Sequence, residues 1–215
     1  MQLLVEAEEQ TAAGQTVPST FALQCRAHAD RVFELLDKTR DLNETSVLVL
    51  DNGTGYLPRR LAQGDTDVVA VELTEKLKKH AVALNSYPSI IYKKTNPFLL
   101  TQEFDLILDS GILCHFHPEI INYFLPRLAC YSRRKMILGF SLERPWYLRF
   151  FSGSLKRDSE FKNPHESRFN ENEITKLIET SCDMLLTERN LSGSSLLIKA
   201  LRKPHSRRQD HSDPR

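Results

Sequence analysis

The sequence has no marked excess of charge of either sign, since 29 Lys and Arg stand against 28 Asp and Glu in 215 residues. Such a balance gives no overall electrostatic signal for a nucleic-acid partner. The four cysteines, Cys25, Cys114, Cys130 and Cys182, form no CxxC pair. That spacing suits neither a structural zinc site nor a disulfide scaffold. We therefore expect reduced thiols and a cytoplasmic protein.

Long apolar runs are also missing, because no stretch approaches the ~20 residues that a membrane helix needs. The N-terminal segment carries acidic residues and has no basic lead into an apolar core, unlike a secretory signal. We expect no membrane association and a single folded domain over residues 19–201. Residues 1–18 are predicted to be a flexible N-terminal segment, and residues 202–215 a disordered C-terminal tail.

Apolar strands alternate with helical segments along most of this domain. Amphipathic spacing predicts a first helix from Ser19 or Thr20 to about Leu42, with Phe21, Cys25, Ala29, Val32 and Leu36 on one face. Strands are predicted at 46–51, 67–72, 89–94, 104–109 and 135–141, and helices at 56–63, 74–85 and 118–132. Strands that are apolar on both faces predict a mostly parallel sheet with helices on both sides, that is, a Rossmann-like α/β fold.

Local signals refine these boundaries. Thr74 is placed to cap the helix that follows it, and Pro126 is expected to kink its helix. Asn170 and Glu173 make a capping-box-like start for a helix ending near Ser181. Residues 183–201 then predict two strands around a Ser-Gly turn, an antiparallel hairpin at the sheet edge.

A glycine loop follows the first strand, in the stretch "VLVLDNGTGYLPRRLA" (47–62). Gly53 and Gly55 would let a ligand approach the backbone at the start of a helix. Glu72 ends the next strand and could accept hydrogen bonds from both hydroxyls of a ribose. Its alternative role is to favour the helix that follows it. A dinucleotide fingerprint would need a third glycine where Pro58 stands, which disfavours a nucleotide-dependent oxidoreductase.

These features resemble the class I S-adenosylmethionine-dependent methyltransferases. The resemblance rests on residues 47–62, "DVVAVELTEKLKKHA", "FDLILDSGILCHF" and the closing pattern "RFNENEITKLIETS…LLIKAL", and covers roughly residues 44–201. It implies a seven-stranded sheet with one antiparallel strand and S-adenosylmethionine bound at the ends of the first two strands. It also implies that Glu72 holds the ribose and that Asn96 hydrogen-bonds the adenine base.

The loop matches the family pattern, an acid followed by three alternate glycines, in two incomplete registers. In the first, Asp51 is the acid and Leu57 replaces the third glycine. In the second, Val49 replaces the acid and Asp51 stands where the first glycine belongs, close to the carboxylate of the methyl donor. The unbroken acid-x-Gly-x-Gly favours the first register, which we prefer. The spacing to Glu72 favours the second.

The resemblance implies a set of site residues. The predicted cofactor-binding residues are Asp51, Asn52, Gly53, Thr54, Gly55, Glu72, Leu73, Asn96, Pro97, Asp109 and Ser110. His115 is the candidate base, because imidazole titrates near neutral pH. Its alternative is a hydrogen-bonded structural role. The predicted substrate-binding residues are Trp146, Tyr147, Arg149, His165 and Arg168. The alternative is that these aromatics belong to the core and these basic residues are solvated.

The predicted function is methyl transfer from S-adenosylmethionine to an unidentified small-molecule or protein acceptor. The alternative is a catalytically inactive binding or scaffold protein, suggested by the imperfect loop. A metal site in "CHFH" is disfavoured because its spacing fits neither a helix face nor a zinc finger. The stretch "DSGI" after the fourth predicted strand lacks the signature of enzymes that methylate amino groups of nucleic-acid bases. No oligomeric state follows from the sequence.

Overall fold

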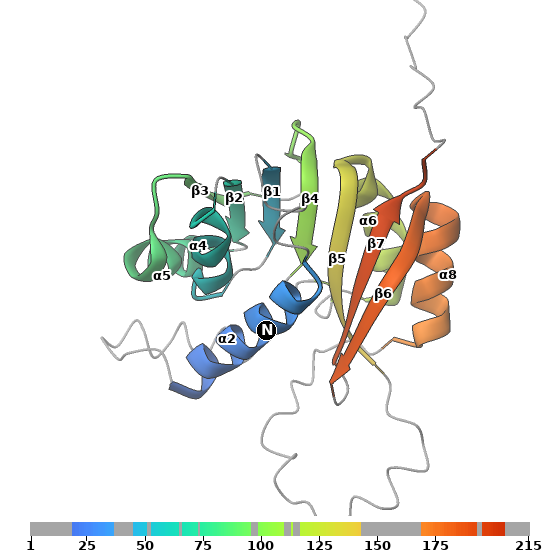
Figure 1. The fold of residues 1–215 in the computed structure, drawn as a ribbon, viewed down its shortest axis with the longest axis horizontal. Helices are drawn as coiled ribbons and strands as arrows, with labels where there is room; N and C mark the ends of the chain where they lie inside the picture. The colour runs from blue at the N-terminus through green and yellow to red at the C-terminus, as the bar shows by residue number, and fades with distance from the viewer. Residues whose placement is uncertain are drawn as a thin grey trace, which may run out of the picture.

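The computed structural model describes residues 19–36, 45–50, 53–64, 66–72, 74–95, 99–109, 113, 117–142, 169–192 and 195–204. These residues form a seven-stranded sheet in the order β3-β2-β1-β4-β5-β7-β6 (Figure 1). Neighbouring strands run parallel except β7, which is antiparallel to both β5 and β6. The predicted sheet, with its one antiparallel strand, is therefore confirmed.

The elements alternate as the sequence pattern indicated. The strands are β1 (Thr45–Leu50), β2 (Thr66–Glu72), β3 (Ile90–Lys94), β4 (Phe104–Asp109), β5 (Ser132–Ser141), β6 (Met184–Ser192) and β7 (Ser195–Arg202). The helices are α2 (Ser19–Glu34), α4 (Tyr56–Ala62), α5 (Glu75–Asn85), α6 (Pro118–Cys130) and α8 (Glu171–Ser181). Each parallel crossover places the carboxyl ends of β1, β2, β3 and β4 at one edge of the sheet, the edge used for ligands in open α/β folds.

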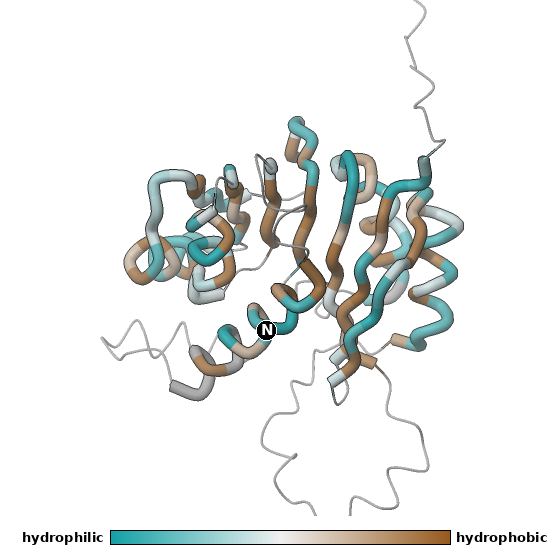
Figure 2. Tube along the Cα trace, viewed as in Figure 1, coloured by the Kyte–Doolittle hydropathy of each residue, from teal (hydrophilic) through white to brown (hydrophobic). Residues whose placement is uncertain are grey.

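Two apolar layers hold the helices to the sheet. Val47 and Val49 of β1 point into one layer with α2 and α4, whereas Leu48 and Leu50 point into the other with α6 and α8. Figure 2 shows the central strands as mostly hydrophobic, with polar residues on the outer sides of the helices. Because both faces of β1 are buried, the strand reads as a continuous apolar run.

Side-chain caps form at two predicted helix starts. Thr74 Oγ1 accepts a hydrogen bond from the Leu77 amide at 3.2 Å, and Asn170 Oδ1 accepts one from the Asn172 amide at 2.9 Å. Ile174 of α8 is buried on the face that the sequence predicted. The antiparallel β6–β7 hairpin at the sheet edge is also confirmed.

Some boundaries differ from the prediction. The first helix ends at Glu34 and is followed by a turn, so the predicted end near Leu42 is wrong. Strand β7 continues through Arg202, one residue into the segment predicted as tail, because the Arg202 guanidinium donates to the carbonyls of Ser132 and Ala129. Pro126 lies inside α6, where the kink stays a prediction.

Within the described ranges, no helix has the length and apolar character needed to cross a membrane.

Candidate functional site

The turn between β1 and α4 contains two glycines in the left-handed region. Gly53 has φ of 60° and Gly55 has φ of 76°. An L-residue adopts this region at a steric cost that glycine does not have. Gly55 is the N-cap of α4, and its carbonyl accepts the Arg59 amide at 3.2 Å. The helix therefore begins directly after the last glycine of the loop.

The position of this helix distinguishes the two glycine registers. Leu57, the third glycine position in the first register, is the second residue of α4 and is 3% exposed in the core. A loop pattern that ends at Leu57 would run into the helix, whereas one that ends at Gly55 stays within the loop. The structure thus favours the second register, in which the buried Val49 replaces the acid. This reverses the preference drawn from the sequence.

Two residues that the sequence did not single out fix the glycine turn. Asn85, at the end of α5, donates from Nδ2 to the Thr54 carbonyl at 2.7 Å. Tyr92 of β3 donates its hydroxyl to the Asn85 carbonyl at 3.0 Å. A Cβ atom at Gly55 would lie only 2.7 Å from the Tyr92 hydroxyl oxygen. The turn is therefore held against α5 and β3 by contacts that leave no room for a side chain.

Glu72 ends β2 beside this turn and is fully buried, with 0% of the residue exposed. Burial, reinforced by the negative charge of Glu72, raises the pKa of Tyr92 to about 12. The Tyr92 hydroxyl thus feels the charge of Glu72 and lies beside Gly55. The structure thus brings together the glycine turn and the acid that the sequence paired.

Asp109 lies at the same edge of the sheet. It is the last residue of β4, it pairs with Leu50 at the end of β1, and it is 1% exposed. Gly53, Thr54 and Gly55 are buried as well. Five of the predicted cofactor-binding residues are thus described, and all five lie at or next to the carboxyl ends of β1, β2 and β4.

The other predicted site residues lie outside the described residues, and their roles stay predictions. They are Asp51, Asn52, Leu73, Asn96, Pro97, Ser110, His115, Trp146, Tyr147, Arg149, His165 and Arg168. Of the stretch "CHFH", only His117 is described; it is exposed, with Nδ1 3.9 Å from Glu119 Oε2. No group of three His, Cys, Asp or Glu that could hold a metal occurs in the part of the chain that the structure describes.

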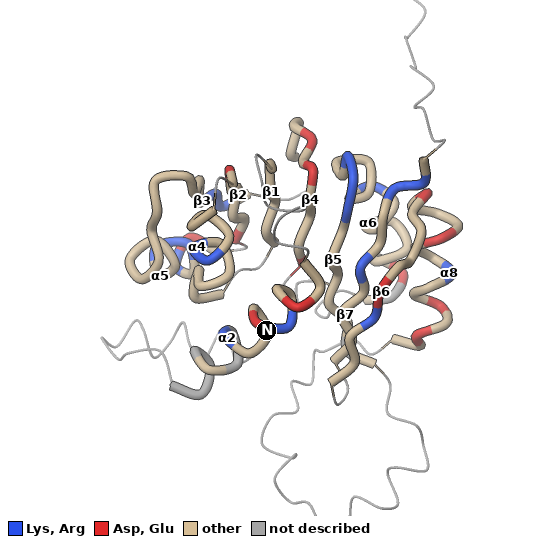
Figure 3. The backbone as a smooth tube through the Cα atoms, viewed as in Figure 1, with Lys and Arg blue, Asp and Glu red and all other residues tan. Residues whose placement is uncertain are grey.

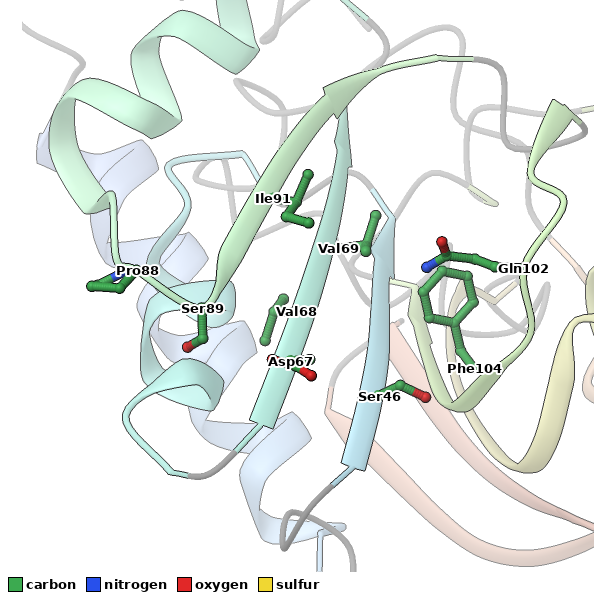
Figure 4. Close-up of a pocket in the computed structure, with 9 residues that line it drawn as sticks. All are labelled: Ser46, Asp67, Val68, Val69, Pro88, Ser89, Ile91, Gln102 and Phe104. Atoms are coloured by element: carbon green, nitrogen blue, oxygen red, sulfur yellow. The ribbon is translucent and has the colours of Figure 1, made fainter.

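A groove of about 360 Å³ opens at the opposite edge of the sheet (Figure 4). Residues at or near the starts of β1, β2, β3 and β4 line it, among them Ser46, Asp67, Ile91 and Phe104. These are the amino ends of the parallel strands. The groove is therefore separate from the glycine turn and Glu72, which lie at the carboxyl ends.

Basic residues gather near the start of β5 and the end of β7 (Figure 3). Acidic groups accompany them, since Arg133 Nε lies 3.4 Å from Glu103 Oε2 and Lys203 Nζ lies 4.0 Å from Asp183 Oδ1. This compensated cluster is at the amino end of β5, away from the carboxyl edge. The absence of a nucleic-acid partner stays a prediction.

Solved structures of methyltransferases share this architecture. Magnesium protoporphyrin IX methyltransferase from Synechocystis, solved with S-adenosylhomocysteine, is 18% identical with a TM-score of 0.71, over 87% of this chain and 89% of that one. The 1,6-didemethyltoxoflavin-N1-methyltransferase from Burkholderia thailandensis, solved with 1,6-didemethyltoxoflavin and S-adenosylhomocysteine, is 16% identical with a TM-score of 0.64, over 94% and 87%. The N-methyltransferase NodS from Bradyrhizobium japonicum is 14% identical with a TM-score of 0.60, over 82% and 86%.

Comparison by sequence adds nothing to this likeness. No family model matches the chain. No curated protein matches it either. The TM-scores and the coverage of both chains nevertheless show that the architecture is shared with these structural neighbours. The chain therefore has the Rossmann-like fold of the class I S-adenosylmethionine-dependent methyltransferases.

Proposed function

We propose that this protein binds S-adenosylmethionine at the carboxyl ends of β1 and β2 and transfers its methyl group to an acceptor. The observation that carries the proposal is the fully buried Glu72 carboxylate beside the left-handed turn at Gly53 and Gly55. The fold of the neighbours supports it, because several were crystallised with S-adenosylmethionine or S-adenosylhomocysteine. The acceptor is a small molecule or a protein side chain.

The described residues suit the chemical groups of this ligand. A carboxylate at the end of β2 can accept both ribose hydroxyls, which is a hydrogen-bonding role for a buried charge. The two glycines bring backbone close to the ligand without side chains, and the Thr54 carbonyl is fixed by Asn85. The Tyr92 hydroxyl is uncharged and donates to the Asn85 carbonyl, so it supports the turn without adding charge. The site is thus ordered by α5 and β3 before a ligand arrives.

The chemistry asks little of the protein beyond alignment. Bound S-adenosylmethionine supplies an electrophilic methyl carbon, which an acceptor lone pair attacks while the carbon–sulfur electron pair stays on sulfur, leaving S-adenosylhomocysteine. The residues of this chain hold the reactants in line and exclude water. His115 is the proposed base for an acceptor that loses a proton.

Replacing Glu72 with glutamine tests the site directly. We expect isothermal titration calorimetry to show at least tenfold weaker binding of S-adenosylhomocysteine, since the amide is uncharged and its nitrogen cannot accept a hydrogen bond from a ribose hydroxyl. The side chain keeps its size, so the packing around Glu72 is retained. Thermal unfolding of the same samples checks that the variant is folded.

The matched control is Glu75→Gln. Glu75 lies three residues later, in the first turn of α5, where its carboxylate pairs with Lys78 at 2.8 Å. This variant is expected to bind S-adenosylhomocysteine as the wild type does. Absence of wild-type binding at millimolar ligand would overturn the proposed function. Equal affinity of Glu72→Gln and wild type would remove Glu72 from the site.

Replacing Asp51 with glycine is expected to strengthen binding of S-adenosylmethionine about tenfold, or about 1.4 kcal/mol. In the register that the structure favours, Asp51 occupies the first glycine position, near the carboxylate of the ligand. Removing one of two like charges a few ångströms apart relieves a repulsion of about this size at an effective dielectric constant between those of protein and water. Calorimetry at low and high salt measures it, because screening should shrink the gain.

The control for this prediction is Asp67→Gly, which removes the same charge from an exposed position at the amino edge of β2. It should leave the affinity unchanged. Unchanged or weaker binding by Asp51→Gly would instead favour the first register, in which Asp51 is the family acid.

A second candidate function is binding without catalysis. It is favoured by Val49, which is buried and apolar where the second register places the family acid. Incubation with S-adenosylmethionine and extracts of small molecules or proteins separates the two candidates. Radiolabelled methyl transfer identifies an enzyme, whereas tight binding with no transfer to any fraction supports the inactive protein.

A further inference from the structure

His28 is a half-buried residue of α2 whose imidazole lies against strand β5. Its Nε2 atom is shielded from solvent and makes no hydrogen bond to any described residue. The Cε1 atom lies 3.6 Å from where a Cβ of Gly139 would be, and the Asp109 carbonyl oxygen lies 3.4 Å from the same point. The ring therefore lies in contact distance of β5, beside the carboxyl end of β4. A buried nitrogen without a partner suggests that a ligand supplies one.

Helix α2 contacts α4, the helix that follows the glycine loop. The Arg26 guanidinium lies 5.5 Å from the ring centroid of Tyr56, the residue next to Gly55. Asp30 forms an ion pair with Arg60 of α4, and Arg60 also lies over the Phe33 ring at 4.1 Å. The helix that carries His28 thus packs directly beside the proposed donor site.

The same helix is fastened on its other side to the β6–β7 hairpin. Arg31 donates from Nε to Asn190 Oδ1 at 3.1 Å and from Nη1 to Ser195 Oγ at 3.1 Å. Its Nη2 atom donates to the carbonyls of both residues. Asn190 in turn donates to Glu34 at 3.0 Å. Figure 1 shows α2 lying across the sheet near the carboxyl ends of β1 and β4. Helix α2, which carries His28, is therefore held by α4 on one side and by the β6–β7 hairpin on the other.

Charge at this position limits what His28 can bind. Burial, with the positive charge of Arg31 as a second cause, lowers the pKa of His28 to about 4. The imidazole is therefore neutral at physiological pH and offers one donor and one acceptor nitrogen. The environment that disfavours imidazolium also disfavours a cationic ligand. A neutral group that carries a hydroxyl or N–H is the chemistry that fits.

We propose that His28 is part of the acceptor site and that its Nε2 atom hydrogen-bonds an uncharged hydroxyl- or N–H-bearing acceptor. This deepens the proposed function, on which it rests. Its role is to position the acceptor, whereas His115 stays the proposed base. The proposal directs the search for acceptors toward neutral small molecules and away from protonated lysine side chains.

His80 provides a matched comparison within the chain. Its Nε2 atom is also buried without a hydrogen bond to a described residue, and burial lowers its pKa. It belongs to α5, however, whose main contacts are with α4, β2 and β3. An effect specific to the acceptor site should therefore involve His28 and leave His80 unchanged.

The test uses ¹⁵N-labelled full-length protein, with imidazole nitrogens observed by NMR. Phenol is the neutral probe and benzylamine, which is an ammonium at neutral pH, is the cationic probe; each is titrated with and without saturating S-adenosylhomocysteine. We expect phenol to shift the His28 Nε2 resonance and leave that of His80 in place. Phenol affinity should fall at least fivefold in His28→Leu and less in His28→Asn, which keeps a polar side chain. Benzylamine should shift neither histidine.

The outcomes separate this proposal from the proposed function. Binding of S-adenosylhomocysteine with no response of His28 to phenol overturns the acceptor site and leaves the donor site intact. Equal responses of His28 and His80, or a response to benzylamine as strong as that to phenol, also overturn it. A phenol response at His28 without any S-adenosylhomocysteine binding supports a ligand site at His28 and overturns the methyltransferase proposal.

Discussion

Replacing Gly55 with alanine is expected to lower the free energy of unfolding by about 2–5 kcal/mol and to abolish binding of S-adenosylhomocysteine. The backbone contributes first, because φ is 76° and a left-handed L-residue is disfavoured by about 1–2 kcal/mol. Packing contributes about 1–3 kcal/mol more. The new Cβ would lie 2.7 Å from the Tyr92 hydroxyl oxygen and 3.1 Å from Ala81 Cβ. Urea unfolding and calorimetry measure the two effects.

The loss of binding follows from the hydrogen bonds that connect Tyr92, through Asn85, to the glycine turn. To accommodate the Cβ, its hydroxyl must move away from the Asn85 carbonyl, which it contacts at 3.0 Å. Asn85 fixes the Thr54 carbonyl, so the displacement reaches the turn that would contact the ligand. In Gly55→Ala/Tyr92→Phe the nearest clashing atom is gone. We expect this double variant to recover about 1 kcal/mol of the stability lost in Gly55→Ala.

Gly64→Ala is the control for this prediction. Gly64 is exposed after α4, its φ is outside the left-handed region, and the nearest atom to an added Cβ is 3.7 Å away. Replacing Gly64 with alanine should change the free energy of unfolding of the protein by less than about 0.5 kcal/mol and leave the binding of S-adenosylhomocysteine unchanged. Equal losses at the two glycines would show that the turn at Gly55 is not the constrained position described above.

The sequence predicts the regular elements well because their causes are local. Apolar runs and helical spacing locate every described strand and helix, and the Thr74 and Asn170 caps act within three residues. Ends of elements depend on more distant contacts. The β5 strand begins at Ser132, ahead of the predicted 135, where the Ser132 carbonyl accepts a hydrogen bond from Arg202, 70 residues further along the chain. No local pattern contains that information.

The candidate site divides in the same way. Gly53, Gly55 and Glu72 follow from strand ends and glycine spacing, which the chain displays in order. Tyr92 looks like any strand aromatic, and its part in the site depends on the parallel pairing of β2 with β3. The surroundings of the His28 imidazole include Gly139, a residue far along the chain that only the fold brings beside the ring. Such residues become visible only when the topology is known.

Acidification is expected to destabilise the protein through His28, by about 3 kcal/mol between pH 7 and pH 4. The pKa of His28 is lowered from 6.5 to about 4 in the folded chain. Above pH 6.5 the imidazole is neutral in both states and contributes nothing. As the pH falls below this value, the His28 imidazole is protonated in the unfolded chain but not in the folded one. The free energy of unfolding therefore decreases. The loss levels off below pH 4, where the folded imidazole is protonated too.

Urea unfolding of wild type and His28→Gln at pH 7 and pH 4 isolates this contribution, because carboxylates that titrate over the same range are common to both proteins. The variant should lose about 3 kcal/mol less than the wild type on acidification. His80→Gln is the control, and should remove a smaller part because the pKa of His80 is lowered less than that of His28. Parallel pH dependence of wild type and His28→Gln would show that the imidazole is protonated freely in the native state.

The cause of the shift can be divided further with Arg31→Gln. Among the described residues facing the imidazole, Arg31 carries the charge, while Gly139 and the Asp109 carbonyl contribute no titratable group. Because burial is the larger cause and Arg31 the second, removing the guanidinium should raise the pKa of His28 only part of the way back toward 6.5. NMR titration of the ring measures this rise directly. Arg31 also hydrogen-bonds α2 to Asn190 and Ser195. A return of the His28 pKa to 6.5 would therefore mean that α2 had detached and that the burial of the ring depends on these hydrogen bonds.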